Sequence, residues 1–153
     1  MRLFSARAFA LAAITAAALI IASCSALPSN AAANTVTLKA TLTGAAEGSQ
    51  PGNPNGSGSA TIALNDTAQT VCYSITVSGI GQATAAHIHK GAAGQSGPIV
   101  VPLGAPTNGS AQGCTNNVNP DTIRAIEQNP AGYYVNVHTA AYPNGAIRGQ
   151  LSR

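Results

Sequence analysis

Histidine is the side chain of this sequence best suited to chemistry, and all three copies lie in two short stretches. His87 and His89 stand two residues apart, and His138 follows in the dense run 133–139. Neutral imidazole is a good ligand for copper and zinc, and a His-x-His pair joined by a third histidine from another strand supplies three nitrogens. We therefore expect a transition-metal site made of His87, His89 and His138. The residue types leave copper and zinc equally open.

The alternative role for these histidines is structural. A glycine-rich loop at residues 90–98 directly follows His89, and imidazole nitrogens can hydrogen-bond the backbone of such a loop. In that case the histidines hold the loop in place and no metal binds.

Strand alternation predicts that the polar residues of these stretches share the outer face of a sheet. Ile88, Val135 and Val137 are the apolar positions, and side chains two residues apart point to the same side of a strand. The residues expected on the outer face are His87, His89, Asn136, His138 and Arg148.

Two of these outward residues are candidates for supporting the site. Asn136 is expected to orient a ligating histidine, with a ladder or turn hydrogen bond as the alternative. Arg148 is expected to attract an anion, or else to pair with Glu127 or a backbone carbonyl and so hold the final hairpin. Tyr133 and Tyr134 divide into one core ring and one outward ring.

Composition favours a small, exported, β-rich domain. Only 7% of the 153 residues are charged and 4% are aromatic. The net charge of +3 includes Arg2 and Arg7 of the leader, and without them five basic residues accompany four acidic ones, a net charge of +1. No basic stripe remains to bind nucleic acid. No carboxylate is close in sequence to a histidine, so nothing in the sequence pairs a nucleophile with a base for hydrolysis.

The first 24 residues are typical of a bacterial lipoprotein signal peptide. Arg2 and Arg7 precede an apolar stretch at 8–22 that is too short to favour a spanning helix. Residues 21–24, Ile-Ala-Ser-Cys, resemble a lipobox, which makes Cys24 the lipidated residue. Residues 25–34 then form a flexible tether. The protein is expected at the cell envelope, on its periplasmic or outer surface; the alternative is an ordinary secretory signal cut near 31–33 and a soluble secreted protein.

The other two cysteines agree with export. With Cys24 assigned to the lipid, Cys72 and Cys114 remain, an even number in an oxidising compartment. A disulfide between them closes a loop of about 40 residues and stabilises the fold by roughly 4 kcal/mol. The alternatives are two free thiols or a metal pair with histidine.

Alternating apolar residues predict six to eight short strands and one helix. The expected strands are residues 35–43, 59–64, 70–78, 83–89, 99–103, 109–115, 133–138 and 146–151. Asn119 and Pro120 are good first residues for a short helix near 120–128, whose apolar face carries Ile123 and Ile126. This pattern indicates an all-β fold, an antiparallel Greek-key sandwich or barrel with one short helix.

Three blocks of the sequence resemble the CHRD domain, a module repeated in the extracellular regulator chordin and found alone in bacterial secreted proteins. The blocks are residues 86–103, 129–139 and 142–151, and the strand at 38–44 fits the usual start. The resemblance covers residues 35–152 and assigns a CHRD domain to residues 35–153. It implies a β-sandwich or Greek-key barrel in an extracytoplasmic binding module, and it names no ligand.

A looser resemblance is to the copper strand of Cu,Zn superoxide dismutases, in which His-x-His lies on the outside of a barrel. It implies an outer-face copper site with Arg148 guiding an anion. Three histidines cannot supply all the metal ligands of that enzyme, and the loop 90–98 adds no carboxylate.

The sequence is therefore compatible with three functions, in this order of preference. The first is a lipid-anchored, non-catalytic binding module that holds copper or zinc. The second is a metal-free module that contacts a protein or glycan and whose histidines are structural. The third is a minimal copper-dependent dismutase.

Overall fold

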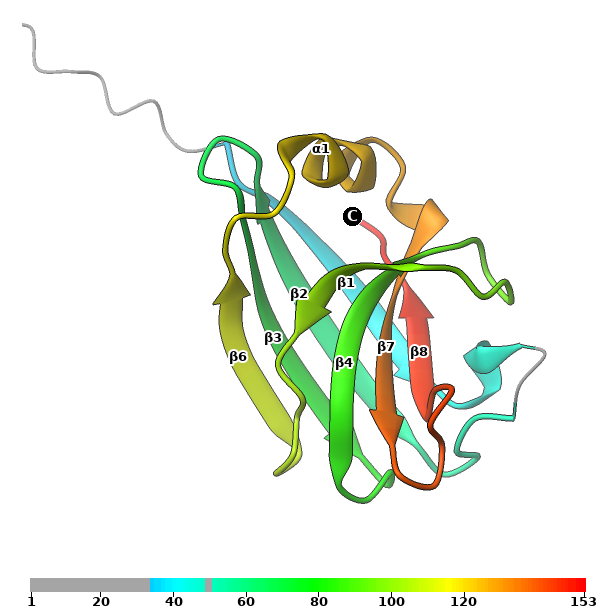
Figure 1. Cartoon of the computed structure of the whole chain (residues 1–153). Coiled ribbons are helices and arrows are strands. Elements are labelled where there is room, and N and C mark those ends of the chain that lie inside the picture. The colour runs from blue at the N-terminus through cyan, green and yellow to red at the C-terminus, as the bar shows by residue number, and fades with distance from the viewer. Residues whose placement is uncertain (1–33, 49–50) are drawn as a thin grey trace, which may run out of the picture.

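The computed structural model describes residues 34–48 and 51–153, so the predicted signal peptide, Cys24 and most of the tether lie outside the described residues. Eight strands and one α-helix, α1, make up the domain (Figure 1). The strands are β1 (Val36–Thr43), β2 (Ser57–Asn65), β3 (Thr70–Ser78), β4 (Ala83–Lys90), β5 (Ile99–Leu103), β6 (Ser110–Thr115), β7 (Tyr133–Thr139) and β8 (Ile147–Gln150). The all-β prediction is confirmed, with strand bounds within two residues of those expected.

The eight strands form one antiparallel sheet that is nearly closed into a barrel. Their order is β5-β4-β7-β8-β1-β2-β3-β6, so the chain crosses between the two halves after β3, after β5 and after β6. The two edge strands approach each other, and the Thr115 hydroxyl donates to the Pro102 carbonyl over 2.5 Å. The backbone N–H of Gly104 donates to the Tyr73 hydroxyl beside this seam, over 2.9 Å. Curling the sheet brings its two edges together in this way.

The core lies inside the barrel and follows the predicted alternation. Most inward residues of the long strands are apolar and buried, because successive side chains of a strand point to opposite faces. The strand residues with no exposed surface include Leu38, Leu42, Ile62, Leu64, Val71, Ile75, Ile88, Val101, Val135, Val137 and Ile147. The other half of the alternation faces outward, and it carries the histidines.

The predicted disulfide is present between Cys72 and Cys114. Cys72 of β3 lies directly opposite Cys114 of β6 on the outer face of the sheet. The bond therefore ties β6, the last strand of the order, to its only neighbour in the described sheet.

The helix α1 spans Pro120–Gln128 and lies over one end of the barrel (Figure 1). The side chain of Asn119 accepts a hydrogen bond from the backbone N–H of Asp121, as expected of an N-cap residue. Ile123 and Ile126 are fully buried against the barrel core. In the part of the chain that the structure describes, no helix is long and apolar enough to cross a membrane.

Candidate functional site

The register of β4, β7 and β8 places the predicted site residues in rows across the outer face. His87 lies opposite Asn136, and Asn136 lies opposite Arg148. Directly opposed residues of an antiparallel pair share a face, so these three form one row. The adjacent row runs His89, Tyr134, Gln150, and His138 lies opposite the small residue Ala85. The structure thus brings together all five predicted residues: the three histidines, Asn136 and Arg148.

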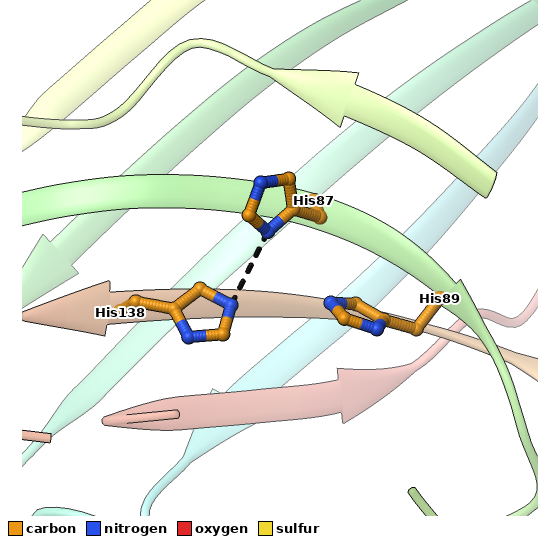
Figure 2. Close-up of side chains that lie close together, drawn as sticks. All are labelled: His87, His89 and His138. Carbon is orange, nitrogen blue, oxygen red and sulfur yellow. Dashed lines mark hydrogen bonds between the residues drawn. The ribbon is translucent and has the colours of Figure 1, made fainter. Parts of the chain in front are cut away.

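The three histidine rings converge on one point of this face (Figure 2). Nδ1 of His87 lies 3.2 Å from Nε2 of His138, and one ring nitrogen from each of the three histidines falls within a set no wider than 4.8 Å. Two ligand nitrogens of a tetrahedral zinc or copper centre are roughly 3.4 Å apart when the metal–nitrogen bonds are about 2.0–2.1 Å. Ring movements on the order of 1 Å would therefore suffice to surround one metal ion.

The hydrogen bonds of two histidines decide which nitrogen is free. Nδ1 of His89 lies 2.9 Å from the Gly97 carbonyl oxygen, and Nδ1 of His138 lies 3.0 Å from that of Pro143. A carbonyl only accepts, so each Nδ1 carries the proton and each Nε2 keeps its lone pair in the neutral ring. Nε2 of His89 is buried and has no partner among the described residues. This is the arrangement of metal-ligating histidines, whose other nitrogen is held by a backbone oxygen.

His87 is joined to His138 by a hydrogen bond that metal coordination would replace. Because Nε2 of His138 is an acceptor, the 3.2 Å contact is a hydrogen bond donated by Nδ1 of His87. If a metal ion is to bind both Nδ1 of His87 and Nε2 of His138, the proton on Nδ1 of His87 must leave or move to Nε2 of the same ring. The metal-free cluster is thus held together by a hydrogen bond that coordination replaces.

A loop between β4 and β5 covers the outer face next to the cluster. The guanidinium of Arg148 donates to the backbone oxygens of Gln95 and Ala92, over 3.0 and 3.2 Å, and to the side-chain oxygen of Gln150. The side-chain amide of Gln150 in turn donates to the backbone oxygen of Gly91. Arg148 therefore bonds backbone carbonyls, one of the alternatives considered for it, and its three hydrogen bonds go to neutral oxygens.

Tyr134 links the histidine cluster to Arg148. Its ring stacks on the His89 ring at a centroid distance of 5.0 Å, and the Arg148 guanidinium carbon lies 3.4 Å from the Tyr134 ring centroid. The Tyr134 hydroxyl also accepts a hydrogen bond from the backbone N–H of Gly97. As expected, Tyr133 belongs to the core and Tyr134 faces outward, but the covering loop leaves Tyr134 only 2% exposed.

Glu47 is the site residue that the sequence did not indicate. It lies in the short 3-10 turn Ala45–Glu47 after β1 and is 4% exposed. Its Oε2 accepts a long hydrogen bond of 3.5 Å from the amide of Asn136, and its Oε1 has no partner among the described residues. A Cβ on Gly145 would lie 2.5 Å from Glu47 Oε2. The available signal was that Glu47 is the only charged residue of the Gly- and Pro-rich stretch 44–56.

These residues enclose a polar pocket of about 430 Å³. Its buried wall consists of Glu47, His89, Tyr134, Asn136 and Arg148, and its exposed residues include Ser96, Pro143 and Asn144. Ligand pockets are commonly about 300–1,000 Å³. The histidine cluster and this pocket adjoin, because His89 and His138 belong to both.

Burial is the main cause of the altered pKa values in the site. It lowers the pKa of His87, His89 and His138, so that the neutral, metal-binding form is favoured at neutral pH. Burial also raises the pKa of Glu47 to about 7, although the positive charge of Arg148 and the Asn136 hydrogen bond oppose this. The pocket thus contains a carboxyl group that changes between its protonated and ionised forms near neutral pH.

The comparison with known families agrees with the fold and the sequence blocks. The family model described as CHRD domain matches residues 38–151, most of the chain. No curated protein and no solved structure gives a match. The match includes the strands that carry the three histidines, Asn136 and Arg148, as well as Glu47. The chain therefore belongs to the CHRD domain family.

Proposed function

We propose that this protein is an extracytoplasmic binding module that holds one transition-metal ion through His87, His89 and His138. The observation that carries the proposal is the convergence of three imidazoles, with Nε2 of His89 buried and without a partner. An orphaned buried acceptor costs free energy, and a metal ion would satisfy it. The disulfide and the CHRD family fit an extracellular domain.

Copper and zinc are the metals that this donor set suits. Three imidazole nitrogens without a thiolate or carboxylate match the ligand preferences of both ions, and copper(II) precedes zinc in affinity at most nitrogen sites. Three protein ligands also leave a coordination position open. The expected order of affinity is therefore Cu(II) above Zn(II).

A calorimetric titration tests this proposal. The chain is exported in soluble form with Cys24→Ser, treated with chelator, and titrated with Cu(II) and Zn(II). One equivalent should bind with a sub-micromolar Kd and should be lost in His89→Ala and His138→Ala. Gln112→Ala, an exposed change on the far strand β6, is the control and should leave the titration unchanged. A folded wild-type protein that binds neither ion would refute the metal site.

The structural role of the histidines is the second candidate, and two contacts favour it. Nδ1 of His89 holds the loop before β5 through Gly97, and Nδ1 of His138 holds the loop before β8 through Pro143. In this alternative the loops themselves contact a protein or glycan. It predicts no stoichiometric metal, together with a loss of stability in the histidine variants.

The dismutase alternative has less support. It would use the open metal position and Arg148 as an anion guide, but Arg148 is 1% exposed and its guanidinium bonds loop carbonyls. Turnover of superoxide by the copper-loaded protein would be its test.

The membrane anchor is a separate part of the proposal. A lipid on Cys24 would attach the domain to the cell envelope by more than one acyl chain, which gives stable anchoring. Radiolabelled palmitate should label the wild-type protein and should not label Cys24→Ser.

A further inference from the structure

The pocket beside the histidine cluster contains acceptors that the metal site does not use. Three residues that line it each carry a buried side-chain atom without a partner among the described residues: Oε1 of Glu47, Oδ1 of Asn136 and Nε2 of His89. A metal ion in the histidine cluster would supply a partner for Nε2 of His89 but not for the oxygens of Glu47 and Asn136. Glu47 and Asn136 are 4% and 3% exposed, and each buried side chain has one acceptor oxygen without a hydrogen bond.

The charges of the pocket select against an ionic ligand. Arg148 is buried and positive, and Glu47 is buried and negative when ionised, so the two charges offset each other across the pocket. The hydrogen bonds of Arg148 already go to Gln95, Ala92 and Gln150. A cation would be repelled by Arg148 and by a metal in the cluster, and an anion would be repelled by Glu47 in its ionised form.

A hydroxyl group is the neutral donor that fits both states of Glu47. It donates to a carboxylate, and it accepts from the protonated acid that a pKa of about 7 makes equally available. Two neighbouring hydroxyls could pair with the Glu47 carboxyl and the Asn136 amide once these groups rotate their buried oxygens toward the pocket. Ser96 and Asn144 at the exposed side supply further polar groups, and the volume of about 430 Å³ admits a molecule the size of a monosaccharide.

We propose that this pocket binds a neutral polyhydroxylated ligand, a sugar or sugar alcohol, through hydrogen bonds to Glu47 and Asn136. The ligand is either a free small molecule or the terminal residue of a glycan chain, and the recognised chemistry is the same. This subsite adjoins the metal site but does not require it, so the subsite and the proposed function can be tested separately.

The test is a titration followed by amide chemical shifts, using metal-free, chelator-treated exported chain. Glucose, glucosamine and glucuronate form a series of one ring with neutral, positive and negative charge, and maltotriose represents a chain end. Glucose should shift the amide signals of residues 47, 136 and 144 with a Kd in the millimolar range. The two charged sugars should bind at least about fivefold more weakly, since each would bring its charge close to a like charge of the pocket. Tighter binding of maltotriose than of glucose would identify the chain end as the source, and equal binding would identify the free sugar.

Two variants assign the contacts. Glu47→Ala and Asn136→Ala should each weaken glucose binding about tenfold, the effect of a lost hydrogen bond to a buried polar group. Glu127→Ala makes the same chemical change on α1, and it should have no effect. Zn(II)-loaded protein should still bind glucose.

Three results would overturn the sugar subsite. One is the absence of shifts at the pocket in a folded protein, and another is an equal effect of Glu47→Ala and Glu127→Ala. The third is tighter binding of either charged sugar, which would make the pocket an ion site instead. A protein that binds glucose but no metal would keep this proposal and refute the metal centre, and the reverse result would do the opposite.

Discussion

The two halves of the barrel show how differently the same strand alternation can be used. In both halves most inward residues of the long strands are apolar and buried. On β2 and β3 the outward residues Ser59, Thr61 and Thr76 are exposed to solvent. On β7 and β8 the outward residues Asn136 and Arg148 are only 3% and 1% exposed. Pointing away from the core is therefore not the same as facing water.

The connections between strands cause this difference. β2 and β3 are joined by the short turn 66–69, which leaves their outer face uncovered. The longer stretch 44–56 instead supplies Glu47, and Asn53 within it bonds the backbone of Ala146 next to β8. The loop 91–98 is held over the same half by Arg148 and His89. The longer loops thus convert one outer face into a pocket and leave the other open.

The two halves are also held together by different interactions. The open half, β1, β2, β3 and β6, contains the Cys72–Cys114 disulfide. The site half, β4, β5, β7 and β8, contains buried polar groups that bond loop backbone. A disulfide holds two strands together even when their outer face is open to water. A buried polar network stabilises the fold only when each of its groups keeps its hydrogen-bond partner.

The largest effect is expected from removing the covalent link of the open half. Cys72→Ser with Cys114→Ser should lower the free energy of unfolding by about 4 kcal/mol, because the bond closes a loop with a sequence separation of 42. Urea unfolding of the oxidised protein and the double variant measures this difference. A loss below about 1 kcal/mol would mean that the ladder between β3 and β6 holds this edge without the bond.

The next effect concerns the buried cation of the site half. Arg148→Met keeps most of the side-chain length but removes three hydrogen bonds, and it should cost about 3 kcal/mol. Thr61→Ala changes an outward, exposed residue of the open half, and it should alter stability by no more than about 0.5 kcal/mol. Urea unfolding compares the two variants. Equal costs would erase the distinction between the covered and the open face.

A smaller effect should depend on pH through Glu47. Its pKa rises from 4.5 in the unfolded chain to about 7 in the fold, so between these values the unfolded state ionises first and the native state loses stability as pH rises. Glu47→Gln should therefore be more stable than wild type at pH 8, by on the order of 2 kcal/mol, and the advantage should vanish below pH 4.5.

Metal-free urea unfolding at several pH values measures the difference between these two proteins. The three histidines act in the opposite direction, because their lowered pKa values remove stability as pH falls below 6.5. They are present in both proteins and cancel in the difference. A difference that does not change with pH would show that Glu47 does not titrate in this range.

The smallest effect is expected on the open face itself. The hydroxyls of Ser59 and Thr76 share a hydrogen bond of 2.9 Å, and both side chains are exposed. Ser59→Ala should change the free energy of unfolding by less than about 0.5 kcal/mol, because water replaces the lost partner. A loss of more than about 1 kcal/mol in the free energy of unfolding would show that side chains of this face stabilise the fold, as those of the site half do.

Much of the molecule could be predicted from local pattern. The core positions of β1 and β2 follow from apolar residues at every second position. Asn119 and Pro120 mark the start of α1 because their preferences act within a few residues. The sharing of one face by His87, His89 and Asn136 also follows, since it depends only on alternation and on which residues are apolar.

The covering of the site could not be predicted in this way. Glu47 is 40 residues before His87 in the sequence, and nothing local shows that a turn after β1 lies against Asn136 and Gly145. Arg148 was expected on an outward face, and its 1% exposure arises from a loop more than 50 residues away. Such contacts depend on where long loops return, which no short pattern encodes.

The sequence by itself determined the strands, their inward and outward faces, the helix and the candidate set of three histidines. These depend on side-chain period and on preferences that act between near neighbours. Only the tertiary structure decided that the histidines converge, that Cys72 faces Cys114, and that Glu47 and Arg148 are buried beside them. Those outcomes depend on strand register and loop path, which are set by packing between segments far apart in the chain.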